Sequence, residues 1–228
     1  MDNLFINELG KHPDLFIATI VVVVFSICMH EMSHTWMARK CGDSTAWDNG
    51  YMTMNPLKLM GIPSIILLFV VGIAWGAVPV NPARLQPQWR RGLVSFAGPA
   101  ANMLLAVFFA GVLALYTVVC DFAPAAKSVE ESVNLLLQLG FRLNVMLAIF
   151  NMIPVPPLDG WDVFATFFPP LNRVTPESRS GAMLLLFALV FMTSASFYVL
   201  QLPSIVATAV VCKLLGVAPY WDAMLHGR

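Results

Sequence analysis

Long apolar stretches alternate with shorter, more polar segments along the whole chain. A helix that crosses a lipid bilayer needs about 20 apolar residues. Five stretches are long enough to reach or enter the bilayer, at residues 15–38, 62–80, 92–120, 132–153 and 181–217. The connections carry most of the charged residues together with helix-ending prolines and glycines, and lie at 39–61, 81–91, 121–131 and 154–180. The pattern predicts an all-α polytopic membrane protein.

Two of the five stretches differ from simple crossings. The fifth is longer than one straight crossing and contains Pro203, so we expect two helices, or one helix and a surface segment. The second contains Pro63, Gly72, Gly76 and Pro79, which give the chain places to bend. We expect this second stretch to enter the membrane and return on the same side.

Composition supports the membrane class and excludes another. Of the 228 residues, 58% are hydrophobic and 11% charged, with a mean hydropathy of +0.75, more apolar surface than one soluble core could bury. Thirteen Lys and Arg balance thirteen Asp and Glu, and there is no long basic run, so we expect the lipid bilayer and no nucleic acid as a partner. The cysteines are scattered without a CxxC pair and are expected to be packing residues: Cys28, Cys41, Cys120 and Cys212.

The sequence His-Glu-Met-Ser-His at residues 30–34 lies inside the first apolar stretch. In a helix, His30 and His34 share one face and can bind one metal ion. The neighbouring Glu31 can take a proton from an attacking water and pass it to the leaving amine. The alternative is a chance cluster at the water interface, but ionisable groups in a membrane span are costly unless paired or bound.

A catalytic zinc ion usually has three protein ligands and an open position. Asp159 is the best third ligand, because it follows the fourth stretch in a proline-rich segment where a helix cannot continue. Such broken backbone at membrane depth is tolerated mainly where it lines a cavity. An ordinary Asp-Gly turn is the alternative, and Asp162 is the rival ligand. Gly160 favours Asp159, because glycine lets the chain pass close to a metal or substrate.

Several motifs together resemble the site-2 protease family of intramembrane zinc metalloproteases. These are the HExxH helix, the Asn-x-x-Pro-x-x-x-Leu-Asp-Gly segment at 151–160, the Gly-Pro-x-x-Asn helix start at 98–102, GYMTMNPL at 50–57 and VPVNP at 78–82. They cover residues 20–165 in the family's order. Trp75-Gly76-Ala77 and the proline pair beside Trp161 depart from the family pattern, so substrate choice could differ.

The resemblance implies one zinc ion per chain on His30, His34 and Asp159, with Glu31 as the base. It also suggests that Asn151 and Asn102 lie near the substrate backbone, where an amide could stabilise an oxyanion; a helix-packing hydrogen bond is the alternative for both. The chain resembles the small bacterial type without PDZ or CBS domains. We therefore expect one domain over 1–228, with a three-helix catalytic core at 15–165 and C-terminal membrane helices at 181–217.

The metal site constrains the topology. His34 and Asp159 reach one ion only if the second stretch is re-entrant, because a full crossing would leave them on opposite faces. One side of the membrane then holds Arg39, Lys40, Lys58, Arg84, Arg90, Arg91, Arg173 and Arg179, while the other holds only Lys11 and Lys127. This positive-inside bias predicts an active site that opens to the cytoplasm of a bacterial inner membrane.

The predicted activity is hydrolysis of peptide bonds within or near transmembrane segments of single-span or hairpin membrane proteins. A membrane metal carrier or metal-binding scaffold is the alternative, in which the same ligands hold a passing ion. The two differ at Glu31: a protease keeps zinc but loses turnover in Glu31→Gln, whereas a carrier that uses Glu31 as a ligand loses binding. An inactive relative that acts as a chaperone is a third possibility.

Overall fold

The computed structural model describes residues 4–122, 126–168, 170–171, 181 and 197–221, and its helices confirm the predicted all-α class. Four helices are long and apolar enough to cross a membrane. They are α2 (Pro13–Lys40), α6 (Trp89–Phe122), α7 (Lys127–Asn151) and the segment Tyr198–Leu215. The protein is therefore an integral membrane protein.

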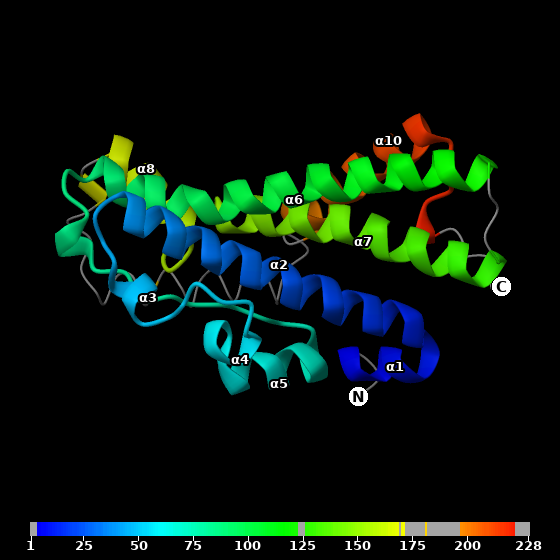
Figure 1. The fold of residues 1–228 in the computed structure, drawn as a ribbon, viewed down its shortest axis with the longest axis horizontal. Helices are drawn as coiled ribbons and strands as arrows, with labels where there is room; N and C mark the ends of the chain where they lie inside the picture. The colour runs from blue at the N-terminus through cyan, green and yellow to red at the C-terminus, as the bar shows by residue number, and fades with distance from the viewer. Residues whose placement is uncertain (1–3, 123–125, 169, 172–180, 182–196, 222–228) are drawn as a thin grey trace.

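Helices α2, α6 and α7 contact one another and form the core, running side by side along the long axis of the molecule (Figure 1). One cluster of buried side chains joins α6 to α7 and includes Phe109, Leu113 and Leu137. Gly140 allows the close approach, because a Cβ there would collide with the Phe109 ring. The chain reverses between these helices, so the C-terminal end of α7 lies beside the first turns of α6 and the end of α2.

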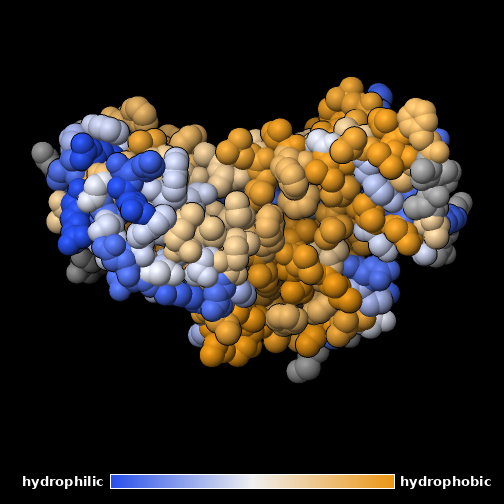
Figure 2. Space-filling view, viewed as in Figure 1, coloured by the Kyte–Doolittle hydropathy of each residue, from blue (hydrophilic) through white to orange (hydrophobic). Residues whose placement is uncertain are grey.

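The surface changes character along the same axis. Hydrophobic side chains cover the middle of the view in Figure 2 and much of the right, where some hydrophilic ones also lie, and the largest group of hydrophilic side chains is at the left. That polar end contains α3 (Thr45–Asp48), α8 (Asp159–Phe167) and the C-terminal end of α2 (Figure 1). The apolar surface fits lipid contact, and the polar end fits a water-facing surface.

The second apolar stretch is not a full crossing. It forms α5 (Gly61–Val71), which is too short to span a bilayer, and then returns as extended backbone over 73–80. Phe69 of α5 contacts Phe16 near the start of α2, whereas Val80 packs near Ala38 at the other end. The stretch therefore enters and returns on one side, as predicted.

The Gly-Pro-x-x-Asn segment does not start a helix. Helix α6 begins at Trp89, and Pro99 lies inside it, so the predicted helix start at residue 98 is wrong. Proline removes one main-chain hydrogen bond and usually kinks a soluble helix, but neighbouring helices let membrane helices tolerate it. The motif sits where α6 packs against the metal-site histidines, as described below.

Most of the remaining elements are short, and η4 and α10 together make up the fourth long segment. They are η1 (Phe5–Asn7), α1 (Glu8–Lys11), α4 (Pro56–Leu59), η2 (Pro82–Arg84), the π-helical turn η4 (Phe197–Gln201) and α10 (Leu202–Leu215). Pro203 lies in the first turn of α10, where its missing N–H costs little. Residues 182–196 of the predicted fifth stretch lie outside the described residues, so the path of that stretch stays a prediction.

Candidate metal centre

Helix α2 places three ionisable side chains in a buried position. His30, Glu31 and His34 are only 7%, 6% and 7% exposed. His34 precedes the last residue of α2, Lys40, by six positions, which puts it about 9 Å from the helix end at 1.5 Å per residue. The cluster therefore lies below the polar end of the molecule, within the length of a membrane-spanning helix.

Asp159 comes to the histidines from the other side. The turn after α7 leads to α8, whose first residue is Asp159. Gly160 makes this possible, because a Cβ at that position would collide with the carbonyl of Met152. The sequence suggests that Gly160 allows close approach to a metal or substrate; the close approach in the structure is to the chain's own backbone.

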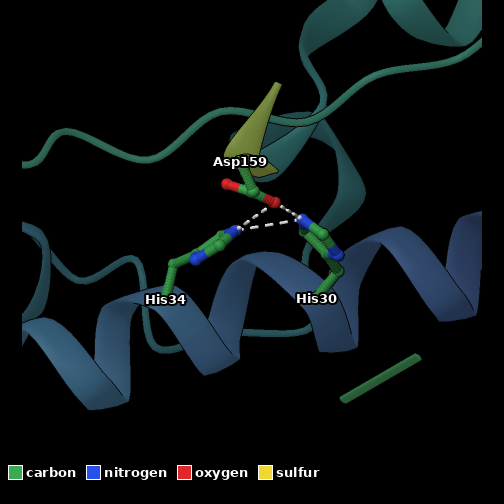
Figure 3. A group of neighbouring side chains, drawn as sticks. All are labelled: His30, His34 and Asp159. Atoms are coloured by element: carbon green, nitrogen blue, oxygen red, sulfur yellow. Dashed lines mark hydrogen bonds and ion pairs between the residues drawn. The ribbon is translucent and has the colours of Figure 1, made fainter. Parts of the chain in front are cut away.

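The nitrogen and oxygen atoms of the three residues point toward one another (Figure 3). The two Nε2 atoms of His30 and His34 are 2.9 Å apart, and Asp159 Oδ2 lies 3.1 Å from the first and 3.3 Å from the second. Ligands at about 2.0 Å from a tetrahedral zinc ion would be separated by about 3.3 Å. The three residues form a group that could hold a metal ion.

The outer hydrogen bonds of the histidines decide which atoms face the group. His34 Nδ1 lies 2.8 Å from the carbonyl oxygen of Val94, and because a carbonyl only accepts, this nitrogen carries the proton. His30 Nδ1 lies 2.7 Å from Asn102 Oδ1 and also donates. Both Nε2 atoms then present lone pairs to a carboxylate oxygen. Such an arrangement is repulsive by itself, and a cation among these atoms makes it attractive.

Gly98 of α6 forms the floor behind the two histidines. A Cβ at Gly98 would lie 2.5 Å from His30 Nε2 and 2.5 Å from His34 Nε2. Any side chain here would therefore occupy the space where the ligand atoms meet. This contact explains why the Gly-Pro-x-x-Asn segment lies inside α6: glycine opens the space, and Asn102, one turn later, reaches His30.

Glu31 lines a cleft of ≈ 760 Å³ that also contains the three ligands. The extended segment 73–80 passes directly over it, because a Cβ at Gly76 would lie 2.5 Å from Glu31 Cγ and Oε1. Among the described residues, the metal-ligand group does not include Glu31. The glutamate is thus beside the metal position without belonging to its ligand set.

Other predicted site residues have different surroundings. The rival ligand Asp162 pairs with Arg91, at 2.7 Å between Oδ1 and Nη2, and is not part of the ligand group. Asn151 lines the cleft while its amide donates to the carbonyl of Leu147. Asn102 uses its amide on His30 and Asn144. The oxyanion roles of both asparagines stay predictions.

Sequence reasoning missed Asn144 and Ser26, which lie behind Asn102. Both are fully buried and are joined by a hydrogen bond of 2.9 Å from Asn144 Nδ2 to Ser26 Oγ. A signal was present, since a polar amide in the middle of a membrane helix needs a buried partner. It did not show which partner.

Two histidines and a carboxylate, with a separate glutamate in the same cleft of an integral membrane protein, match the ligand set and base of a membrane metalloprotease. The sequence model of peptidase family M50 matches residues 18–135 and 116–195. The chain belongs to this family, the site-2 proteases. No solved structure matches the chain at a significant level.

Similar proteins carry names of the same class. The chain is 32% identical to YwhC of Bacillus subtilis over 88% of its own length and 90% of the relative. It is 32% identical to Rip2 of Mycolicibacterium smegmatis, over 75% of this chain and 64% of the relative. It is 30% identical to Rip2 of Mycobacterium tuberculosis, over 79% of this chain and 67% of the relative. All three are named as candidate zinc metalloproteases.

Proposed function

We propose that the protein uses one zinc ion to hydrolyse peptide bonds within or beside transmembrane segments of other membrane proteins. The observation that carries this proposal is the depth of the site. His30, His34 and Asp159 converge below the end of a membrane-spanning helix, where a soluble substrate has little access. The substrates we propose are single-span or hairpin membrane proteins.

The chain's own residues supply the rest of the chemistry. A zinc ion on the three ligands would supply Lewis acidity and an open coordination position. Glu31 takes a proton from the attacking water and delivers it to the leaving amine, which needs a carboxylate beside the metal position and outside the ligand set. The outer hydrogen bonds of His30 and His34 keep their Nε2 lone pairs directed at the metal.

Segment 73–80 is suited to hold an unwound substrate. The N–H of Trp75 bonds Ser64 Oγ, and that of Ala77 bonds the carbonyl of Leu59, so these groups face α4 and α5. Within the described part of the chain, the alternate N–H groups of Gly76 and Val78 have no such partner. An extended peptide could add to this edge through backbone hydrogen bonds, independent of its sequence.

The same proposal orients the protein. In the described residues, Arg39 and Lys40 end α2 at the polar end, and Arg84, Arg90 and Arg91 lie in the connection to α6 and its first turn. Lys127 starts α7 at the opposite end. This charge difference supports a site that opens to the cytoplasm, in the inner membrane of a bacterium.

The test compares zinc content and cleavage in purified wild type, Glu31→Gln, Asp159→Ala and Asp162→Asn with a single-span test substrate in lipid vesicles. We expect about one zinc ion and cleavage in wild type. Glu31→Gln should keep zinc and lose about 100-fold or more in rate, the scale of general acid–base catalysis. Asp159→Ala should lose zinc, whereas Asp162→Asn, the matched control in the same helix turn, should keep it.

Two outcomes would overturn the proposal. Normal cleavage by Glu31→Gln would remove the glutamate from the mechanism. Zinc binding without cleavage in wild type, together with loss of zinc in Glu31→Gln, would instead support a metal carrier or scaffold.

A further inference from the structure

A chain of hydrogen bonds runs from the metal-site histidine to the opposite helix. His30 Nδ1 lies 2.7 Å from Asn102 Oδ1, and Asn102 Nδ2 lies 3.0 Å from Asn144 Oδ1. Asn144 Nδ2 then lies 2.9 Å from Ser26 Oγ and 2.8 Å from the carbonyl oxygen of Gly140. Asn102, Asn144 and Ser26 are all 0% exposed. The chain links α2, α6 and α7 at the depth of the metal centre.

The direction of this chain follows from its last member. The Gly140 carbonyl can only accept, so the NH2 group of Asn144 must face it, and Asn144 Oδ1 must face Asn102. Asn102 then has to direct its own NH2 group at Asn144 and its oxygen at His30. An oxygen facing His30 Nδ1 requires the proton on Nδ1. A backbone carbonyl in α7 therefore determines the tautomer of a histidine in α2.

We infer that Asn102 and Asn144 are positioning residues that hold His30 in the tautomer whose Nε2 faces the metal. Asn102 acts on the histidine directly, and Asn144 acts by fixing the direction of the Asn102 amide. His34 needs no such relay, because Val94 offers it a backbone carbonyl. The inference rests on the proposed zinc site, but its first test does not require zinc.

The first test reads the tautomer in metal-free protein. The protein is labelled with [15N]histidine in bilayers. His12 and His226 are replaced by Gln so that only His30 and His34 report, and Asp159 is replaced by Ala so that no carboxylate accepts a proton from Nε2 in the absence of metal. In this background, solid-state NMR should show the proton on Nδ1 of both. In Asn102→Leu, His30 should become a mixture of tautomers, whereas His34 should not change. Asn102→Asp should restore the wild-type state, because a carboxylate also accepts from Nδ1.

The second test measures zinc affinity by competition with a chelator. Asn102→Leu should weaken binding by about 10–100-fold, the usual effect of losing an outer hydrogen bond to a metal ligand. Asn144→Leu should weaken it less, and the double variant should equal Asn102→Leu, because Asn144 acts only through Asn102. The matched control is Gln138→Leu. Gln138 lies in the same helix as Asn144, is 1% exposed and makes two hydrogen bonds of its own, but to Ala218 and Tyr220.

Different results would contradict the relay and the proposed zinc site. If His30 keeps its tautomer in Asn102→Leu, or if the double variant is the sum of the single ones, the relay is wrong. If Gln138→Leu weakens zinc binding as much as Asn144→Leu, the effect is general loss of packing and the inference also fails. If wild type binds no zinc while the tautomers behave as expected, the proposed function fails and the relay stands.

Discussion

The metal centre lies between two walls of different construction. The inner wall consists of α2, α6 and α7, and its polar residues His30, His34, Asn102 and Asn144 are at most 7% exposed. The outer wall is segment 73–80, in which no residue is buried and Trp75 is 46% exposed. The inner wall is held by helix packing and internal hydrogen bonds, and the outer wall by a few contacts to α2, α4 and α5. The difference separates two tasks, since metal ligands need fixed geometry and a substrate needs access.

Two glycines allow a direct test of this difference. A Cβ at Gly98 in the inner wall and a Cβ at Gly76 in the outer wall would each lie 2.5 Å from a functional side chain. The same methyl group can therefore be added to both walls. The packing of each wall predicts how far its backbone can move to accommodate the methyl group. It therefore predicts whether zinc binding or turnover is lost.

The largest effect is expected for Gly98→Ala. The new methyl group would meet the imidazoles of His30 and His34, which cannot retreat because Asn102 and Val94 hold their far sides. Zinc affinity should fall by about 100-fold or more, as a displacement of about 1 Å is costly in a fixed site. Metal content of the purified protein measures the loss.

Gly111→Ala is the matched control. Gly111 lies in the same helix, and no atom lies within 4 Å of the position that its new methyl group would occupy. Alanine is the better helix former by up to about 1 kcal/mol, so zinc content and folding should be unaffected or improved. Zinc retained by Gly98→Ala at wild-type affinity would show that the inner wall is not rigid.

A smaller and different effect is expected for Gly76→Ala. The methyl group would meet Glu31, but segment 73–80 is only partly packed and can move outward. Zinc affinity should stay at the wild-type value, while kcat should fall by about tenfold because Glu31 or the substrate edge is displaced. Loss of zinc in Gly76→Ala would show that the outer wall also determines metal binding, contrary to this comparison. An unchanged kcat would show that the contact with Glu31 does not affect turnover.

The sequence predicted the elements of the inner wall better than their contacts. The apolar stretches located α2, α6 and α7, and the HExxH spacing placed both histidines on one helix face, because periodicity is a local property. The role of Gly98 and the direction of the Asn102 amide depend on how α6 packs against α2 and α7. Such packing brings together residues that are far apart in the chain, so a local sequence pattern cannot predict it.

The outer wall was predicted in path but not in detail. The geometry required by the metal site and the charge distribution correctly indicated a re-entrant stretch, with the prolines and glycines in 62–80 as places to bend. They did not show that its second half is extended or that Gly76 lies on Glu31. The helix start at residue 98 came from the family resemblance and was also wrong: the surrounding helices allow Pro99 inside α6, which begins at Trp89.

Ser64→Ala tests how the outer wall is held. Ser64 Oγ donates to the Trp75 carbonyl at 2.7 Å and accepts from the Trp75 N–H at 2.9 Å, so one hydroxyl fixes both polar backbone groups of this residue. Its loss should weaken docking of the segment by about 1–3 kcal/mol. We expect a KM increase of a few fold, faster hydrogen exchange in 73–80 and unchanged zinc. Ser132→Ala, which removes a hydroxyl that bonds only within α7, should change none of these.

The smallest effect is expected where the outer wall ends. Asp43 is fully buried after α2 and accepts hydrogen bonds from the N–H of Asn81 at 2.6 Å and from Thr45. Burial raises the pKa of this carboxyl, but the hydrogen bonds from Thr45 and Asn81 and the charge of Arg84 outweigh it and hold the pKa below its usual range. The pKa of Asp43 is lower in the folded protein than in the unfolded chain, where it is about 4. The stabilisation by this carboxylate is therefore complete above about pH 4 and is lost as the pH falls through the pKa of the folded protein.

Asp43→Asn replaces one of the two accepting oxygens with a donor, which should cost about 1–3 kcal/mol of local stability at neutral pH. Limited proteolysis after Arg84 measures how often this loop detaches. The variant should be cut faster than wild type at pH 7. The two rates should converge as the pH falls from about 4 through the lowered pKa of folded Asp43, because the wild-type carboxyl is then protonated as well. Zinc content should be equal in both proteins at pH 7, because Asp43 holds the outer wall and its hydrogen bonds and ion pair reach no polar residue of the inner one. Equal cleavage rates at pH 7 would show that the end of segment 73–80 is held by something other than this carboxylate.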